Sequence, residues 1–274
     1  VIRGSDPSSL GGYVFSLYRR ALSDTRPRDW VLTFVVSLPQ AVLSPGTEGI
    51  AFKRLMKSQD LLVLFRIVSL ELAEARLRIG VQDAERAAAK LPFDWEGWEP
   101  ESPEGVYFHG ADQGEAALAE NHSARALAEA VGISKTEVSA SLRRSMDAGL
   151  ARRDRHSGLP RANRAALLEL GEHCLRWVFP MRPGPLARGI ATGFSAPVLA
   201  DQVLSAGENP LVWPDPRGKA TGQSITPLYK SVPQAVRGDP DLYAILALLD
   251  ALRLGQPRER AIARDKLAAM LGMT

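Results

Sequence analysis

Side chains able to bind a polyanion are concentrated in one part of the chain. Seven arginines lie between positions 143 and 164, against only Asp147 and Asp154: Arg143, Arg144, Arg152, Arg153, Arg155, Arg161 and Arg164. Just upstream stand Ser134, Lys135, Thr136 and Ser139. Arginine and lysine pair with phosphates or guanine, and short hydroxyls bond to phosphates or base edges. The stretch is therefore a candidate polyanion surface, which the net charge of +3 alone does not reveal.

Local signals predict two helices joined by a tight turn to position these residues. Ser123 is a suitable N-cap for a first helix ending at Gly132, where the turn needs a left-handed backbone. Ser134 then starts a second helix, Lys135 to Ala148, with Glu137 expected to reach back in a capping box.

The second helix has a predicted buried stripe of Val138, Leu142 and Met146. This pattern turns six polar residues toward the other faces: Lys135, Thr136, Ser139, Ser141, Arg143 and Arg144. We expect Lys135, Thr136, Ser139 and Arg143 to meet base edges in a major groove, with Ser134 beside them. The alternative for Arg143 and Arg144 is a solvated helical face.

A basic hairpin is predicted next. Gly149 ends the helix, Leu150 to Arg155 forms a strand, and the chain turns at 156–160 to return through Arg161. We expect Arg144 and the hairpin arginines, Arg152, Arg153, Arg155 and Arg161, to neutralise phosphates. Asn163 then caps a helix reaching Phe179, whose predicted buried stripe is Leu167, Leu170, Cys174 and Val178.

Three regions surround this stretch. Residues 1–55 are an N-terminal extension, partly disordered, with a possible helix at 13–22 and a strand at 30–38. A core helix, Met56 to Ile79 with Ser58 as N-cap, opens the domain 56–180. An irregular insertion at about 81–121 follows, with ten acids and two bases. It is either a solvated loop anchored by its aromatics or an acidic face that binds a basic partner or shields the basic surface.

The segment 181–274 is rich in proline and glycine and ends in a helix pair. Trp213 to Gln223 suggests a turn or short hairpin with Gly218 at its tip. Asp239 caps an apolar helix reaching Leu254, and a last helix is expected from Pro257 to Leu271. Because leucines nearly encircle the first of this pair, it is either deeply buried or shared with a partner.

The chain resembles MarR-like winged helix-turn-helix transcriptional regulators. It is more similar still to a group of bacterial proteins of uncharacterised function with the same winged helix, a proline-rich region and a C-terminal helix pair. The resemblance covers Met56 onwards apart from the insertion, through segments such as LAEAVGISKTEVSASLRR and VWPDPRGKATGQSITPLYKSVPQAV. It implies a mainly α fold with a small β wing, a loop-rich helical C-terminal region, and DNA binding by the helix and the wing.

Other functional classes have little support in the sequence. The four histidines are scattered, His173 and Cys174 point about 100° apart on one helix, and no metal-binding or hydrolase motif occurs. We therefore expect no catalytic residues, no metal, no cofactor and no enzyme. A single cysteine and apolar runs well below the ~20 residues of a membrane span predict a cytoplasmic protein without membrane contact.

Two functions are consistent with these observations. The first is a transcriptional regulator of double-stranded DNA, acting as a homodimer because such proteins usually read two half-sites. The alternative is a protein-binding module, such as an antitoxin-like neutralising partner of a neighbouring effector. It would use the winged helix as a scaffold or autoregulator, and bind through the acidic insertion or the C-terminal helices.

Overall fold

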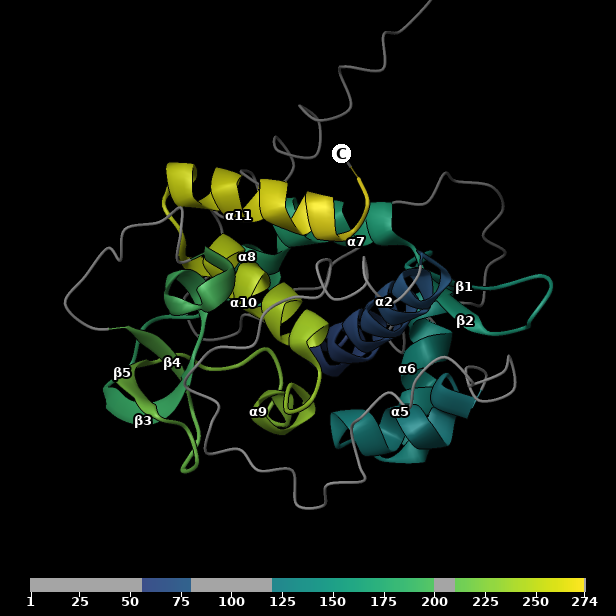
Figure 1. Ribbon diagram of the computed structural model, residues 1–274, viewed down its shortest axis with the longest axis horizontal. Helices are drawn as coiled ribbons and strands as arrows, with labels where there is room; N and C mark the ends of the chain where they lie inside the picture. The colour runs from purple at the N-terminus through teal and green to yellow at the C-terminus, as the bar shows by residue number, and fades with distance from the viewer. Residues whose placement is uncertain (1–55, 80–119, 200–209, 274) are drawn as a thin grey trace, which may run out of the picture. The chain divides into compact units, whose positions relative to one another are not determined.

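The computed structural model describes residues 56–79, 120–199 and 210–273 (Figure 1). The described part is mainly α-helical with a small two-stranded sheet, as expected, and it also contains a second sheet of three strands that was not predicted. The predictions for residues 1–55 and nearly all of 81–121 lie outside it. The helices are α2 (Ser58–Ile79), α5 (Ala124–Val131), α6 (Lys135–Asp147), α7 (Arg164–Glu169), α8 (Leu175–Val178), α9 (Val232–Ala235), α10 (Pro240–Leu254) and α11 (Pro257–Met270). The strands are β1 (Ala151–Arg153), β2 (Pro160–Ala162), β3 (Leu186–Ala191), β4 (Leu211–Pro214) and β5 (Ala220–Ser224).

Helix α2 is the core helix that the sequence predicts. Every side chain from Leu61 to Phe65 is fully buried, and the helix packs against α5, α6, β2 and α10. Ion pairs reinforce the contact with α10: Arg66 binds Asp239, and Arg76 binds Asp241. Because α2 is packed on all sides, it fixes the positions of α5, α6, β2 and α10 around it.

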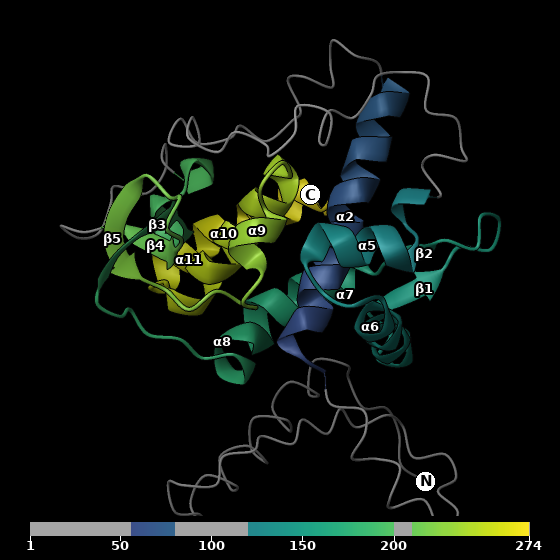
Figure 2. The same cartoon turned by 90° about the horizontal axis from the view of Figure 1, so that it is seen from below.

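The predicted pair of helices and the hairpin are both present. Ser123 caps α5 by accepting a hydrogen bond from the Ala126 amide (3.1 Å), and Gly132 adopts the left-handed conformation with φ 65°. Gly149, at φ 73°, ends the turn after α6. Strands β1 and β2 then pair antiparallel, with Arg152 opposite Arg161. Figure 2 shows the hairpin extending beyond α5 and α6.

The helix after Asn163 has a different buried face from the predicted one. Asn163 caps α7 as expected, but residues Leu170–Cys174 form a π-helical turn between α7 and α8, in which the Leu175 amide bonds to the Leu170 carbonyl. The extra residue in that turn rotates α8 relative to α7. Leu175 is consequently fully buried, whereas the predicted Cys174 and Val178 are only partly buried.

The three strands β3, β4 and β5 close into a small barrel. The predicted turn before β5 is present, with the Gly218 amide bonded to the Asp215 carbonyl at 3.0 Å. The short hairpin considered as an alternative is wrong, because β4 and β5 run parallel and both pair antiparallel with β3. Gly218 is buried rather than at an exposed tip, since a Cβ there would lie 2.1 Å from the Gly189 carbonyl carbon.

Helix α10 is buried on all sides within this chain. Its residues from Asp241 to Arg253 are all buried, which confirms core burial over a face shared with a partner. The Asp250 carboxylate accepts hydrogen bonds from Trp213 Nε1 (2.6 Å), Thr192 Oγ1 (3.0 Å) and Arg253 Nη1 (2.8 Å). The bonds from Trp213 and Thr192 attach the barrel to α10, and the bond from Arg253 lies within α10. Among the described helices, none is long and apolar enough to cross a membrane.

Candidate nucleic-acid interface

Helix α6 has one apolar face and one cationic, hydroxyl-bearing face. Val138 and Leu142 are buried, as predicted, whereas Met146, the third residue of the predicted stripe, is only half-buried. Lys135, Ser139 and Arg143 are exposed at positions i, i+4 and i+8, so they form one stripe, with Thr136 exposed beside it. Lysine and arginine side chains flank short hydroxyls on this stripe, which is the chemistry that base edges and phosphates require.

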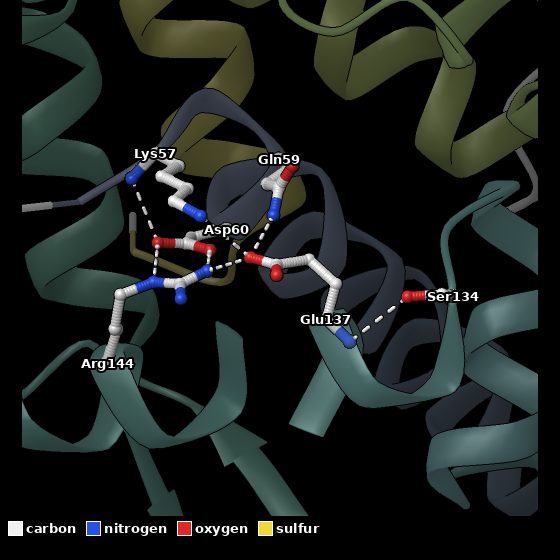
Figure 3. A network of polar contacts seen from close by, with 6 residues as sticks. All are labelled: Lys57, Gln59, Asp60, Ser134, Glu137 and Arg144. Atoms are coloured by element: carbon white, nitrogen blue, oxygen red, sulfur yellow. Dashed lines mark hydrogen bonds and ion pairs between the residues drawn. The ribbon is translucent and has the colours of Figure 1, made fainter. Parts of the chain in front are cut away.

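Arg144 points inward, contrary to the expectation that it faces outward (Figure 3). Its guanidinium forms a bidentate ion pair with Asp60 of α2: Nε donates to Oδ2 at 2.9 Å and Nη2 donates to Oδ1 at 2.6 Å. The Asp60 side chain is fully buried and that of Arg144 is 15% exposed. A buried carboxylate needs a counter-ion, and hydrogen bonding to Asp60 raises the pKa of Arg144. Arg144 therefore fixes α6 to α2.

The predicted capping box at α6 is only half formed. Ser134 Oγ accepts the Glu137 amide at 3.3 Å, so the cap is present. The Glu137 carboxylate does not reach back; it accepts hydrogen bonds from Arg144 Nη2 (2.8 Å), Lys57 Nζ (3.1 Å) and Gln59. Hydrogen bonds from Arg144 and Lys57 lower the pKa of Glu137. Arg144, on α6 itself, and Lys57, just before α2, attract this carboxylate more strongly than a neutral amide can.

Ser141 is a second correction on α6. The prediction turned it away from the buried stripe, but its side chain is 1% exposed, like that of Ser145 one turn later. Their small size suits the contact side of the helix, because α6 packs along α2 there. Helix α6 consequently buries a wider arc than the three-residue stripe predicted.

The hairpin exposes three arginines. Arg152, Arg153 and Arg155 are all exposed, as predicted. Arg153 Nη1 donates to the Gly158 carbonyl at 3.0 Å, and Asp154 organises the turn by accepting from the Ser157 amide (3.0 Å) and hydroxyl (2.7 Å). Hydrogen bonding to Ser157 lowers the pKa of Asp154. The turn is thus internally ordered.

Arg161 differs from the other hairpin arginines because it is paired within the chain. Its Nη1 donates to Glu74 Oε2 of α2 at 2.7 Å, and the other oxygen of Glu74 lies 2.6 Å from Nε2 of the buried His122. Burial opposes the ionisation of Glu74, but the hydrogen bonds from His122 and Arg161 outweigh it and lower its pKa. Arg161 therefore anchors the hairpin to α2 instead of facing a ligand.

Sequence reasoning missed these acidic partners on α2. Beside Arg161, Glu71 accepts the Ala162 amide at 2.9 Å and pairs with Arg164 at 2.9 Å. The one available signal was the presence of carboxylates within an otherwise apolar helix, because a buried acid is rarely left unpaired. That signal identifies the acids but not which arginines neutralise them.

Metal ligands and the single cysteine can be assessed among the described residues. Among them, no three His, Cys, Asp or Glu side chains are grouped so as to hold a metal ion. Burial raises the pKa of the Cys174 thiol, which disfavours a reactive thiolate. An open groove between α2 and the hairpin contains Glu71, Glu74 and Arg161, which already bind one another or their neighbours.

Comparisons with known proteins found no relative of this chain. No protein-family model, curated protein sequence or solved structure matches the chain. The similarity to MarR-like regulators stays a prediction from the sequence motifs, and function has to be inferred from the site itself.

Proposed function

We propose that the chain binds double-stranded DNA as a transcriptional regulator with a winged helix-turn-helix. Helix α5, the left-handed turn at Gly132 and α6 are the helix-turn-helix, and β1 and β2 are the wing. One observation carries the proposal: arginines that point inward are neutralised by acids of α2, while the remaining cations of α6 and the wing stay exposed. An exposed, ordered cationic surface is what a polyanion requires.

The dimensions of α6 suit a major groove. Thirteen residues at 1.5 Å per residue give a helix about 20 Å long, and a bare B-DNA major groove is about 12 Å wide, enough to admit it. We assign base contacts to Lys135, Thr136, Ser139 and Arg143, which share its exposed face.

The wing supplies affinity rather than specificity. Arg152, Arg153 and Arg155 are assigned to phosphates or to the adjacent minor groove. Arg144 and Arg161, first expected to do the same, are assigned to positioning, because α2 binds their guanidinium groups. Ser134 is assigned to the cap of α6. A homodimer that reads two half-sites completes the proposal.

The alternative of a protein-binding module loses part of its basis. It depended on an acidic insertion, which lies outside the described residues, and on an apolar C-terminal helix. That helix, α10, buries its apolar surface inside this chain. The exposed cations of α6 and the wing favour the DNA-binding proposal instead.

Selection of DNA from a randomised library with the purified chain tests the proposal. We expect enrichment of one palindromic sequence, with half-sites about one helical turn apart. Thr136→Ala with Ser139→Ala should weaken the sequence preference and leave the salt dependence of binding unchanged, because neither side chain is charged. No enrichment above background would refute sequence-specific binding.

A further inference from the structure

The turn between α5 and α6 is bonded to a residue of the C-terminal region. Ser231, the residue before α9, donates a hydrogen bond from Oγ to the Val131 carbonyl at 2.5 Å, across 100 positions of the chain. A serine at the start of a helix usually caps that helix, but the Ser231 side chain makes no capping bond to α9. Its hydroxyl therefore serves α5 instead of its own helix.

This bond completes the C-terminal end of α5. The last four carbonyls of a helix have no partner inside it. In the turn, the amides of Gly132 and Ile133 both bond to the Ala128 carbonyl. The carbonyl of Val131, the last residue of α5, receives its hydrogen bond from Ser231. The end of α5 thus depends on α9 as well as on the turn itself.

The glycine of the turn also packs against α9, and Figures 1 and 2 show α9 beside α5. A Cβ on Gly132 would lie 3.2 Å from the Ser231 Cβ and 3.5 Å from Gln234 Oε1. A side chain at position 132 is therefore opposed twice, by the left-handed backbone and by the approach of α9. Val131 of α5 and Val232 of α9 are both fully buried. The turn is thus packed against α9 as well as bonded to it.

The chain that follows α9 is fixed to α2. Asp239 accepts hydrogen bonds from Ser69 Oγ (2.5 Å) and from Arg66, both on α2. Helix α2 also holds α6, because Asp60 binds Arg144. The turn is consequently supported from two sides: α2 holds α6 directly, and α9, anchored to α2, holds the end of α5.

The position of this turn determines where α6 presents its base-contacting side chains. Lys135 and Thr136 follow the turn directly, and recognition helices contact bases mainly through their N-terminal residues. Such side chains have to be held within about 0.5 Å of their working positions. We propose that Ser231 is a positioning residue for base reading, through which α9 braces the α5–α6 turn and fixes α6 in its reading orientation. This inference rests on the proposed function.

The test compares the full chain carrying Ser231→Ala with wild type. Fluorescence anisotropy measures the affinity for the selected site and for a random duplex of the same length. We expect Ser231→Ala to lower the ratio of these affinities by about 2- to 10-fold, the range that corresponds to one net hydrogen bond. The affinity for the random duplex and its salt dependence should not change, because the exposed cations are intact.

The matched control is Ser195→Ala. Ser195 is half-buried like Ser231, and its Oγ accepts a hydrogen bond from the Leu211 amide at 2.8 Å. Its loss should lower the free energy of unfolding by a similar amount and leave the affinity ratio unchanged. An equal fall of the ratio in both variants would show that Ser231 contributes only to stability, and would overturn the positioning role.

Amide hydrogen exchange without DNA separates this inference from the proposed function. The amides of Gly132 and Ile133 should exchange faster in Ser231→Ala and at the wild-type rate in Ser195→Ala, because only the first variant loses the brace. An unchanged exchange rate refutes the brace. An unchanged affinity ratio, when wild type prefers the selected site, refutes the positioning role alone. Wild-type protein that prefers no sequence refutes the proposed function and base reading with it, and the exchange rates then still decide whether α9 braces the turn.

Discussion

If the chain binds DNA as proposed, the salt dependence of that binding distinguishes the exposed arginines from the paired ones. Five cations of α6 and the wing are exposed: Lys135, Arg143, Arg152, Arg153 and Arg155. If each neutralises one phosphate, the slope of log K against log salt is about −4.5 per helix-turn-helix on a site-length duplex. Counting the inward-pointing Arg144 and Arg161 as well would give about −6.3. The difference between these two slopes is large enough to be measured.

Substituting Arg152→Ala with Arg153→Ala removes two of the five exposed cations. The slope should fall to about −2.7. Raising the salt from 50 to 200 mM should then weaken binding by roughly 40-fold per helix-turn-helix, compared with roughly 500-fold per helix-turn-helix for wild type. Sequence preference should be unchanged, since the α6 side chains are intact. Fluorescence anisotropy titrations at four or more salt concentrations, on specific and random duplexes, measure both quantities.

The matched control for this experiment is Arg258→Glu, which changes the net charge equally at a position on α11. It should retain the wild-type slope. A slope that does not change in the Arg152/Arg153 variant would refute phosphate binding by the wing. A similar fall in the control would show that net charge, and not the position of the arginines, determines affinity.

Three further predictions concern stability. Gly158→Ala should lower the free energy of unfolding by about 1–2 kcal/mol, because Gly158 has a left-handed backbone. Gly132→Ala should lower it more, because the added Cβ also contacts Ser231. Urea unfolding measures both losses. Asp60→Asn should cost about 3 kcal/mol, by the same assay, because it leaves Arg144 without its main counter-ion; a loss under 1 kcal/mol contradicts this. Because the pKa of Glu74 is lowered in the folded chain, its ion pair stabilises the fold fully at pH values above 4.5, the ordinary pKa of a glutamate. This stabilisation is lost as the pH falls from 4.5 through the lowered pKa. Glu74→Gln should therefore be less stable at neutral pH and lose less stability on acidification, whereas an unchanged pH profile contradicts the pairing.

Features set by neighbouring residues in the chain were predictable from the sequence. The caps at Ser123, Asn163 and Asp239 and the left-handed Gly132 all form as expected, because each depends on a few consecutive residues. The exposed arginines of the hairpin are predictable in the same way from Gly149 and the short turn after it.

Features set by distant partners were not predictable. Glu137 could bond to its own N-cap or to cations, and its cationic partners are Lys57, 80 residues away just before α2, and Arg144, which Asp60 of α2 holds in place. Arg144 occupies a polar position in the helical pattern, yet Asp60, 84 residues away, turns it inward. In the barrel, the sequence of the turn indicates a local reversal of the chain. It does not indicate with which strand β5 pairs, so the parallel pairing of β4 with β5 could not be inferred.

The acids of α2 also determine how far apart α6 and the wing are held. Asp60 anchors α6, and Glu74 anchors the wing through Arg161. Fourteen residues of helix separate these two acids, which at 1.5 Å per residue is about 21 Å. Half a turn of B-DNA, the step from a major groove to the adjacent minor groove, is about 17 Å. The two spacings are similar, which under the proposed function is consistent with α6 in a major groove and the wing at the next minor groove of one duplex. Under the proposed function, the ion pairs that remove Arg144 and Arg161 from the DNA-contacting surface thereby set its geometry.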